Sequence, residues 1–131
     1  MSGLVTFRLG ERDYATPLSA VCEVVRLERL TDLPGMTPPL AGVLDLRGIA
    51  LPVLDLRHAG AVRGDVLVVE GDSYGVAVDA VQAVVTEGEL PPGGSPGAEL
   101  PSYVVAVLRG PDGPVFLVDL ARMVDSVRGA A

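Results

Sequence analysis

The chain has 131 residues, a length that suits one compact unit with its own hydrophobic core. Lys and Arg together number 10 and Asp and Glu 17, and the net charge of −7 disfavours nucleic acid and anionic membrane surfaces as partners. Hydrophobic residues make up 49% of the chain, which excludes a disordered protein.

The apolar pattern is mostly that of short strands. Val5, Phe7 and Leu9 alternate with polar residues, which predicts a half-buried strand, and Tyr14 opens a second strand after a turn. Further strands are expected at Val24–Leu27, Gly42–Arg47, Ile49–Leu56, Val66–Glu70, Tyr74–Asp79, Ala83–Thr86, Tyr103–Arg109 and Val115–Leu120. Short strands at this spacing indicate an all-β barrel or sandwich. Pro52 implies an edge position or a bend in its strand.

Three connectors and one helix complete the expected elements. The connectors are Pro34–Pro39, His58–Gly64 and the longest loop, Gly88–Pro101. Near the end of the chain, four apolar residues recur at helical spacing, and they predict a short amphipathic helix over about 119–127 with Asp119 as its cap. These four are Leu120, Met123, Val124 and Val127.

An internal repeat is the most informative feature of the sequence. Residues 12–26 align without a gap on residues 72–86, and Leu46-Arg47-Gly48 resembles Leu108-Arg109-Gly110. Asp55-Leu56 likewise resembles Asp119-Leu120. We therefore predict a single domain over 1–131 made of two small five-stranded β-barrels, at about 4–57 and 65–120. The two barrels should share a hydrophobic core, with the helix over their junction.

Catalytic chemistry finds little support in these residues. The duplicated Asp55 and Asp119 invite a paired-carboxylate hypothesis, but each is followed by Leu, and a strand-end or capping role is favoured. Cys22 and His58 could form a nucleophile–base pair, although Cys22 lies in an apolar run typical of a core position. A single Cys and a single His also exclude a disulfide framework and the usual metal sites. No enzyme activity, metal or cofactor is expected.

Binding is the remaining class of function. Glu23 and Arg47 are charges set in the most apolar part of the first repeat, and Arg47 precedes Gly48 at a strand break. A carboxylate partner would hold the guanidinium in a fixed pose for recognition, whereas an exposed ion pair would contribute little. The spacing alone does not decide between these alternatives.

The segment from Gly42 to Arg57, GVLDLRGIALPVLDLR, strongly resembles the hallmark of the chemotaxis coupling protein family, CheW. The family pattern there is G-V-I-N-L-R-G followed by an apolar strand. The opening strand at Val5, the Val21-Cys22-Glu23 segment and the strands at Tyr74 and Val115 fit the same family. The resemblance covers nearly the whole chain.

This resemblance implies a non-enzymatic adaptor with two five-stranded barrels. Such adaptors join the regulatory domain of a CheA-type histidine kinase to the cytoplasmic tip of a methyl-accepting chemotaxis receptor. The resemblance assigns Val21, Glu23, Arg47 and Gly48 to the receptor-proximal surface or its integrity, and it places the kinase contact at barrel ends. Asp45 departs from the family asparagine, and the connector after Arg57 is shorter than usual.

Two other functions stay open at this point. One is a small β-barrel module that binds or senses a ligand near Cys22 or His58, and the other is a CheW-like adaptor of a non-chemotaxis motility or developmental pathway. No apolar run approaches the roughly 20 residues of a membrane helix, and the first residues carry no leader signature. A cytoplasmic protein without membrane insertion is expected, recruited to receptor arrays in the adaptor case.

Overall fold

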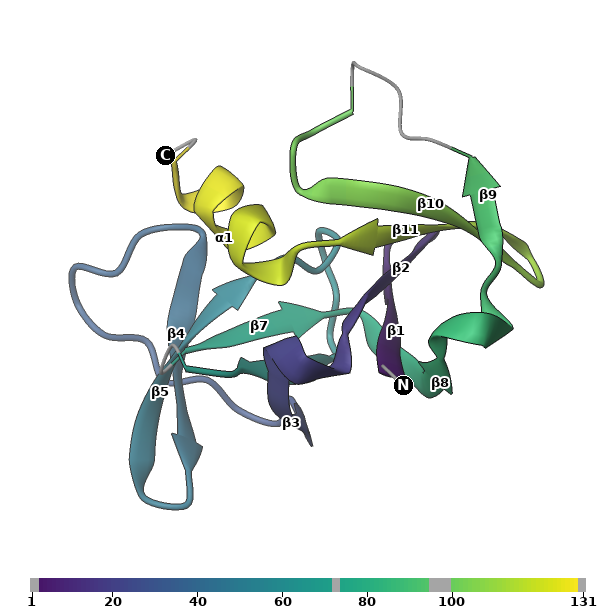
Figure 1. Ribbon diagram of the computed structural model, residues 1–131. Coiled ribbons are helices and arrows are strands. Elements are labelled where there is room, and N and C mark those ends of the chain that lie inside the picture. Colours follow the sequence, from purple (N-terminus) through teal and green to yellow (C-terminus); the bar gives the residue numbers. More distant parts are fainter. Residues whose placement is uncertain (1–2, 72–73, 95–99, 130–131) are drawn as a thin grey trace.

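The computed structural model describes residues 3–71, 74–94 and 100–129. Within these residues the chain forms eleven strands in two sheets, two single-turn 3-10 helices and one α-helix (Figure 1). The expected class, mainly β with one C-terminal helix, is confirmed. Neither sheet closes into a complete barrel, because each hydrogen-bonded ladder ends at two edge strands. The subdomains are curved open sheets.

The six-stranded sheet has the order β8-β1-β2-β11-β10-β9. Its strands are β8 (Ala80–Thr86), β1 (Gly3–Leu9), β2 (Arg12–Pro17), β11 (Gly113–Val118), β10 (Val104–Gly110) and β9 (Pro92–Gly94). The five-stranded sheet has the order β3-β6-β7-β5-β4. Its strands are β3 (Val21–Arg26), β6 (Asp65–Val69), β7 (Gly75–Val78), β5 (Ile49–Asp55) and β4 (Leu40–Leu46).

The two sheets do not coincide with the two halves of the chain that the repeat suggested. The first-half strands β1 and β2 lie beside β8, β10 and β11, whereas the second-half strands β6 and β7 lie between β3 and the β5-β4 hairpin. The six-stranded sheet therefore takes two strands from the first half and four from the second, and the five-stranded sheet takes three from the first half and two from the second. A period-2 pattern identifies strands but not their partners, so the sequence could not reveal this exchange.

The repeat itself is confirmed by the strand register. Ala15 of β2 pairs in parallel with Leu117, and its repeat counterpart Gly75 of β7 pairs in parallel with Val53. The edge strands β3 and β8 also shift register at matching places. The pairing of β3 with β6 shifts between Val21 and Glu23, and the pairing of β8 with β1 shifts opposite Thr6 and Phe7. Residues 72 and 73 of the aligned segment lie outside the described residues.

One part of the repeat alignment was wrong. Arg47 and Gly48 form the turn between β4 and β5, because Leu46 and Ile49 are the last paired residues. Arg109 lies within β10, opposite Pro114, and the matching turn is made by residues 111 and 112. The shared Leu-Arg-Gly letters therefore occupy different places in the two hairpins.

A shared core joins the two sheets, as expected. It includes Val5 and Phe7 from the six-stranded sheet, Leu67 and Val76 from the five-stranded sheet, and Leu120 of the helix α1 (Leu120–Gly129). In Figure 1 the helix follows the end of β11 and lies on the side of the five-stranded sheet. Asp119 accepts the backbone N–H of Arg122 at 3.1 Å, so it caps the helix as predicted.

Each sheet curls around a second, smaller cluster on its other face. The five-stranded sheet packs Leu44, Leu51, Val53, Val66, Val68 and Ala77, and the six-stranded sheet packs Leu4, Ala15, Leu90, Leu108 and Val115. Residues with alternating direction along each strand therefore feed two different clusters. This arrangement explains why so many strands are apolar on both faces.

Two further predictions concern Pro52 and the segment Gly88–Pro101. Pro52 lies in β5 opposite Val43, and the ladder from β5 to β7 begins one residue later, at Val53, so only one neighbour pairs at the proline. The segment predicted as the longest loop, Gly88–Pro101, contains part of the 3-10 helix η2 (Glu87–Glu89) and the strand β9. Residues 95–99 of that segment lie outside the described residues. The other 3-10 helix, η1 (Leu18–Ala20), links β2 to β3.

Candidate functional site

Glu23 owes its direction to the bulge in β3. Val21 pairs with Val69, but Glu23 pairs with Val68, so Cys22 is the extra residue of the bulge. A regular register would leave Glu23 on the face of Val21, toward the shared core. The bulge instead turns Glu23 onto the face of Val68, which belongs to the second cluster of this sheet.

Arg47 stands at the tip of the β4–β5 hairpin, which extends away from the body of the protein in Figure 1. Both turn residues have positive φ, 51° for Arg47 and 85° for Gly48, which is the geometry of a two-residue type I′ turn. Asp45 stabilises the turn, because its Oδ1 accepts the N–H of Gly48 at 2.8 Å. An asparagine oxygen accepts the same hydrogen bond, so the departure at Asp45 is compatible with the turn.

The guanidinium of Arg47 binds the Glu23 carboxylate with two nitrogens. Nη2 lies 2.5 Å from Oε1 and Nη1 lies 3.2 Å from Oε2, so the geometry is bidentate. Hydrogen bonding by Arg47 holds the pKa of Glu23 below its ordinary value, and Glu23 in turn raises the pKa of Arg47. The pair is therefore fully charged at neutral pH.

The ion pair joins the two edges of the five-stranded sheet, since β3 and β4 are its first and last strands. An isolated bridge also pairs Thr31, in the connector after β3, with Val43 of β4. We call Glu23, Arg47 and Gly48 the closed mouth of this sheet. The Arg47 side chain is 69% exposed and its neighbour Ile49 is 65% exposed, so the closed mouth presents a fixed charge beside an apolar side chain to solvent.

The four residues assigned to the receptor-proximal surface divide into two groups. Glu23, Arg47 and Gly48 lie together at the closed mouth. Val21 is only 9% exposed and belongs to the shared core, so it supports β3 from within. A Cβ added at Gly48 would meet no atom within 4 Å, so the glycine is required by its backbone angle and not by crowding.

The repeat places an open counterpart in the other sheet. The positions of Glu23 and Arg47 correspond there to Ala83 of β8 and Pro111 of the β10–β11 turn. These two residues line a hollow of about 230 Å³ together with Val85, Leu90 and Val115. We call this group the open mouth. The alignment of residues 12–26 with residues 72–86 places Ala83 opposite Glu23 but does not reveal the hollow.

Cys22 and His58 are not brought together. Removal of water around the thiol, followed by its hydrogen bond to Glu70 and the negative charge there, raises the pKa of Cys22 and disfavours a thiolate. His58 Nδ1 lies 2.5 Å from Oδ1 of Asp79, and Oδ2 of Asp79 accepts the N–H of Gly10 at 2.7 Å. Asp79 thus ties the connector at His58 to the β1–β2 turn. No pattern in the sequence indicates this link.

The duplicated aspartates have the structural roles that the sequence favoured. Asp55 binds Arg57 with both oxygens, each at 2.9 Å, and Asp119 caps the helix. The Arg57 side chain is only 13% exposed, so the Asp55–Arg57 pair is more buried than the Glu23–Arg47 pair. The two aspartates serve different elements and do not form a dyad.

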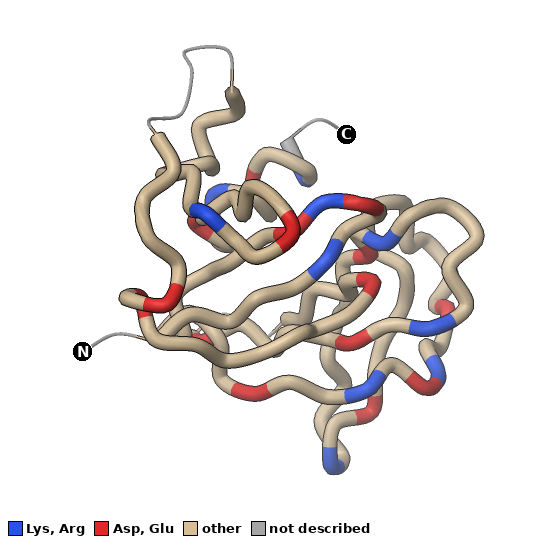
Figure 2. The backbone as a smooth tube through the Cα atoms, turned by 90° about the vertical axis from the view of Figure 1, so that its right-hand side faces the viewer, with Lys and Arg blue, Asp and Glu red and all other residues tan. Residues whose placement is uncertain are grey.

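Acidic and basic positions are interspersed along the described part of the chain in the view of Figure 2. Within residues 3–71, 74–94 and 100–129, no helix has the length and hydrophobicity that a membrane crossing requires.

The model of the CheW-like domain matches residues 3–128. The chain belongs to the CheW-like domain family. Its fold resembles the crystal structure of the scaffolding protein TtCheW from Thermoanaerobacter tengcongensis, with a TM-score of 0.71 and 25% identity over 91% of this chain and 84% of that one.

Curated relatives agree with this family. "Chemotaxis protein CheW" of Treponema pallidum is 25% identical over 142 aligned positions, covering 94% of this chain and 82% of the relative. The protein of the same name from Bacillus subtilis is 33% identical over 54 residues, and "Protein PilI" of Pseudomonas aeruginosa is 40% identical over 52 residues. Those two matches span 35% and 29% of the relatives' lengths.

Proposed function

We propose that this CheW-like protein is a non-enzymatic adaptor that couples the cytoplasmic tip of a chemoreceptor to a CheA-type histidine kinase. The family match across residues 3–128 supports this function, as do relatives named as chemotaxis proteins and a structural neighbour described as a scaffolding protein. An adaptor needs two separate binding surfaces and no reactive centre. In this role the protein works in the cytoplasm, at membrane-associated receptor arrays.

The observation that carries the proposal is the bidentate Glu23–Arg47 pair at an exposed hairpin tip. A guanidinium that is already oriented loses little freedom when a partner binds, and arginine is enriched among residues that dominate protein interfaces. Ile49 adds an exposed apolar side chain beside it. The closed mouth therefore suits the charged and apolar stripe of a receptor helix.

The kinase would bind at the other sheet. The open mouth offers a largely apolar hollow on the six-stranded sheet, with Asp13 and Asp112 also in its lining. A partner side chain could fill it because Ala83 and Pro111 stand where the closed mouth has its ion pair. The two mouths belong to different sheets, so both partners can be bound at once. This separation is what distinguishes coupling from simple competition for one surface.

A tagged pull-down from native lysate tests the proposal, with Arg47→Glu beside the wild type and bound proteins identified by mass. We expect the wild type to recover a histidine kinase and a long helical receptor, and Arg47→Glu to keep the kinase but lose the receptor. Arg109→Glu is the matched control, since Arg109 is also an exposed arginine, located on β10 away from the closed mouth.

Two results would contradict the proposal. Recovery of neither partner by a folded wild type would remove the adaptor function. A fall in the melting temperature of Arg47→Glu as large as that of a core truncation would make the ion pair structural instead of a binding surface. The matches to proteins named CheW and PilI leave the pathway open between chemotaxis and a related motility system, and the identity of the recovered receptor decides it.

A further inference from the structure

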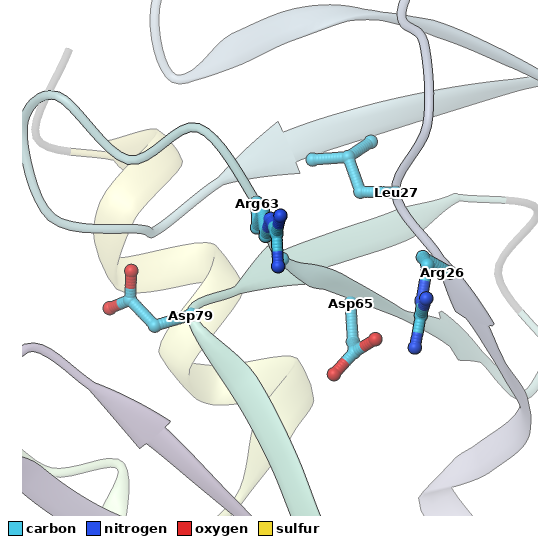
Figure 3. Close-up of a pocket in the computed structure, with 6 residues that line it drawn as sticks. Arg26, Leu27, Arg63, Asp65 and Asp79 are labelled. Atoms are coloured by element: carbon cyan, nitrogen blue, oxygen red, sulfur yellow. The ribbon is translucent and has the colours of Figure 1, made fainter.

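A hollow of about 470 Å³ lies at one end of the face that the five-stranded sheet turns toward the shared core. Figure 3 shows the residues around it. Arg26 is the last residue of β3 and Leu27 follows it, Arg63 and Gly64 come from the connector before β6, and Asp65 and Asp79 complete the lining. We call this group the arginine hollow. Arg26 and Glu23 lie on opposite faces of β3, so the hollow is separate from the closed mouth.

The two carboxylates of the arginine hollow already have partners. Asp65 Oδ2 accepts the backbone N–H of Val81 at 2.8 Å. Asp79 accepts the N–H of Gly10 and pairs with the ring of His58, and its side chain is only 12% exposed. These hydrogen bonds fix both carboxylates as parts of the crossover between the sheets.

The two guanidiniums have no such partners. Among the described residues, neither the Arg26 nor the Arg63 side chain has an ion pair or a hydrogen bond to the protein. Three other arginines are paired: Arg8 binds Asp13, Arg47 binds Glu23 and Arg57 binds Asp55. Arg29, Arg109 and Arg128 have no side-chain partner among the described residues either, so Arg26 and Arg63 are distinguished by lining the same hollow.

We propose that the arginine hollow is an oxyanion site, which takes a carboxylate or phosphate group between Arg26 and Arg63. The planar guanidinium presents its N–H donors in a fork that matches such oxygens, and two of them can share one anion. The protein supplies the N–H donors and the positive charge, and the ligand supplies the negative charge. Binding makes and breaks no covalent bond. The site goes beyond the proposed adaptor function and does not depend on it.

The same oxyanion chemistry is available from a free anion and from an acidic side chain of a docked peptide. The neighbouring aspartates oppose either ligand by like charge, so binding should be weak, with a dissociation constant of about a millimolar. Conversion of Asp65 to Asn keeps the oxygen that accepts from Val81 and removes one opposing charge. Asp65→Asn should therefore bind the anion more tightly than the wild type.

Titration of the isotope-labelled protein at low ionic strength tests the site, with amide shifts of Leu27 and Gly64 as the readout. The probes are inorganic phosphate, succinate and a short end-blocked glutamate peptide, with the matching glutamine peptide as the neutral control. Arg26→Gln/Arg63→Gln should weaken binding by at least about tenfold. Arg109→Gln, which removes an exposed guanidinium elsewhere, should leave it unchanged.

Each outcome of the titration either supports or overturns the oxyanion site. Saturable shifts with phosphate or succinate place the ligand in solution, and shifts with the glutamate peptide alone place it on a docked protein; both require the loss in the double variant. Absence of shifts with every probe overturns the proposal. So does equal binding by Arg26→Gln/Arg63→Gln, because the guanidiniums would then not be the ligand-binding groups. The double variant changes exposed side chains, so its unaltered spectrum away from the hollow verifies that it is folded.

Discussion

The closed mouth and the open mouth occupy the same place in two copies of one design. Each lies between a bulged edge strand and the turn of a hairpin, but one holds Glu23 and Arg47 where the other holds Ala83 and Pro111. The six-stranded sheet forms its strands with alanine and proline at these positions. A sheet of this design can thus form without such an ion pair, which agrees with the recognition role that we propose for Arg47.

The two sheets could instead be separate folding units. Removal of a buried side chain from the shared core tests whether they unfold together. Leu67→Ala deletes a fully buried side chain of the shared core and should lower the free energy of unfolding by about 2–5 kcal/mol. Urea unfolding followed by circular dichroism should show one transition for both sheets. Val84→Ala is the control, because Val84 is 61% exposed and should change stability by less than about 0.5 kcal/mol. Two separated transitions would contradict the shared core.

The two aspartates that the repeat aligns, Asp55 and Asp119, have different partners. Burial acts to raise the pKa of Asp55, but hydrogen bonds from Arg57 outweigh it and hold that pKa below its ordinary value. Asp55→Asn should lower stability at neutral pH by about 1–3 kcal/mol, because the nearly buried Arg57 loses its charged partner.

The pH dependence of this effect has a defined sign. A carboxylate with a depressed pKa stabilises the fold above its unfolded pKa of about 3.9, and this contribution disappears as pH falls through the folded pKa. Thermal unfolding from neutral pH to the acid limit should therefore show the wild type converging on Asp55→Asn below about pH 4. A constant difference between the two proteins across this range would exclude Arg57 as the cause.

The turn of the closed mouth can be weakened without touching its charges. Gly48→Ala places a side chain at φ 85° and should cost about 1–2 kcal/mol of unfolding free energy. Gly48→Asn should cost less, because asparagine tolerates this region. The control is Gly88→Ala, at an exposed glycine without positive φ, where thermal unfolding should show little change. An equal effect of both alanine variants would mean that the turn angle is not what requires glycine at 48.

The smallest expected effect comes from giving the open mouth the residues of the closed one. Ala83→Glu combined with Pro111→Arg should recreate an exposed ion pair, and a double-mutant cycle should measure a coupling of about 0.2–1 kcal/mol. The same double variant should lose kinase in the pull-down, since the new side chains cover the apolar hollow. Retention of the kinase would move its binding surface away from the open mouth.

Much of the architecture was predictable from local patterns. Alternation marked most strands, the spacing from Leu120 to Val127 marked the helix, and the matched tyrosines and valines at 12–26 and 72–86 revealed the repeat. These features depend on neighbours in sequence. The exchange of strands between the repeats depends on partners far along the chain, and the short strand β9, made of Pro and Gly, has no strand-like pattern at all.

The site was predictable in composition but not in geometry. Glu23 and Arg47 could be singled out as charges in an apolar setting. The strand was predicted only from Val24, however, and the apolar pattern around Cys22 does not indicate the bulge that turns Glu23 away from the shared core. The Leu-Arg-Gly letters shared by the two repeats also do not mark the same position, because the second hairpin turns at residues 111 and 112. The arginine hollow combines three separate segments, and its acidic members conceal it in any count of charge.

The exchange of strands also constrains how the protein is made. Thr16 of β2 donates its hydroxyl to the carbonyl of Val118, 102 residues later, and Thr6 of β1 reaches Ala83 across 77 residues. During synthesis the N-terminal hairpin therefore waits, without its neighbouring strands, until almost the whole chain has left the ribosome. Such high contact order predicts slow folding and a long exposure of strand edges, so newly made chains should depend on chaperones more than the modest size of the domain suggests.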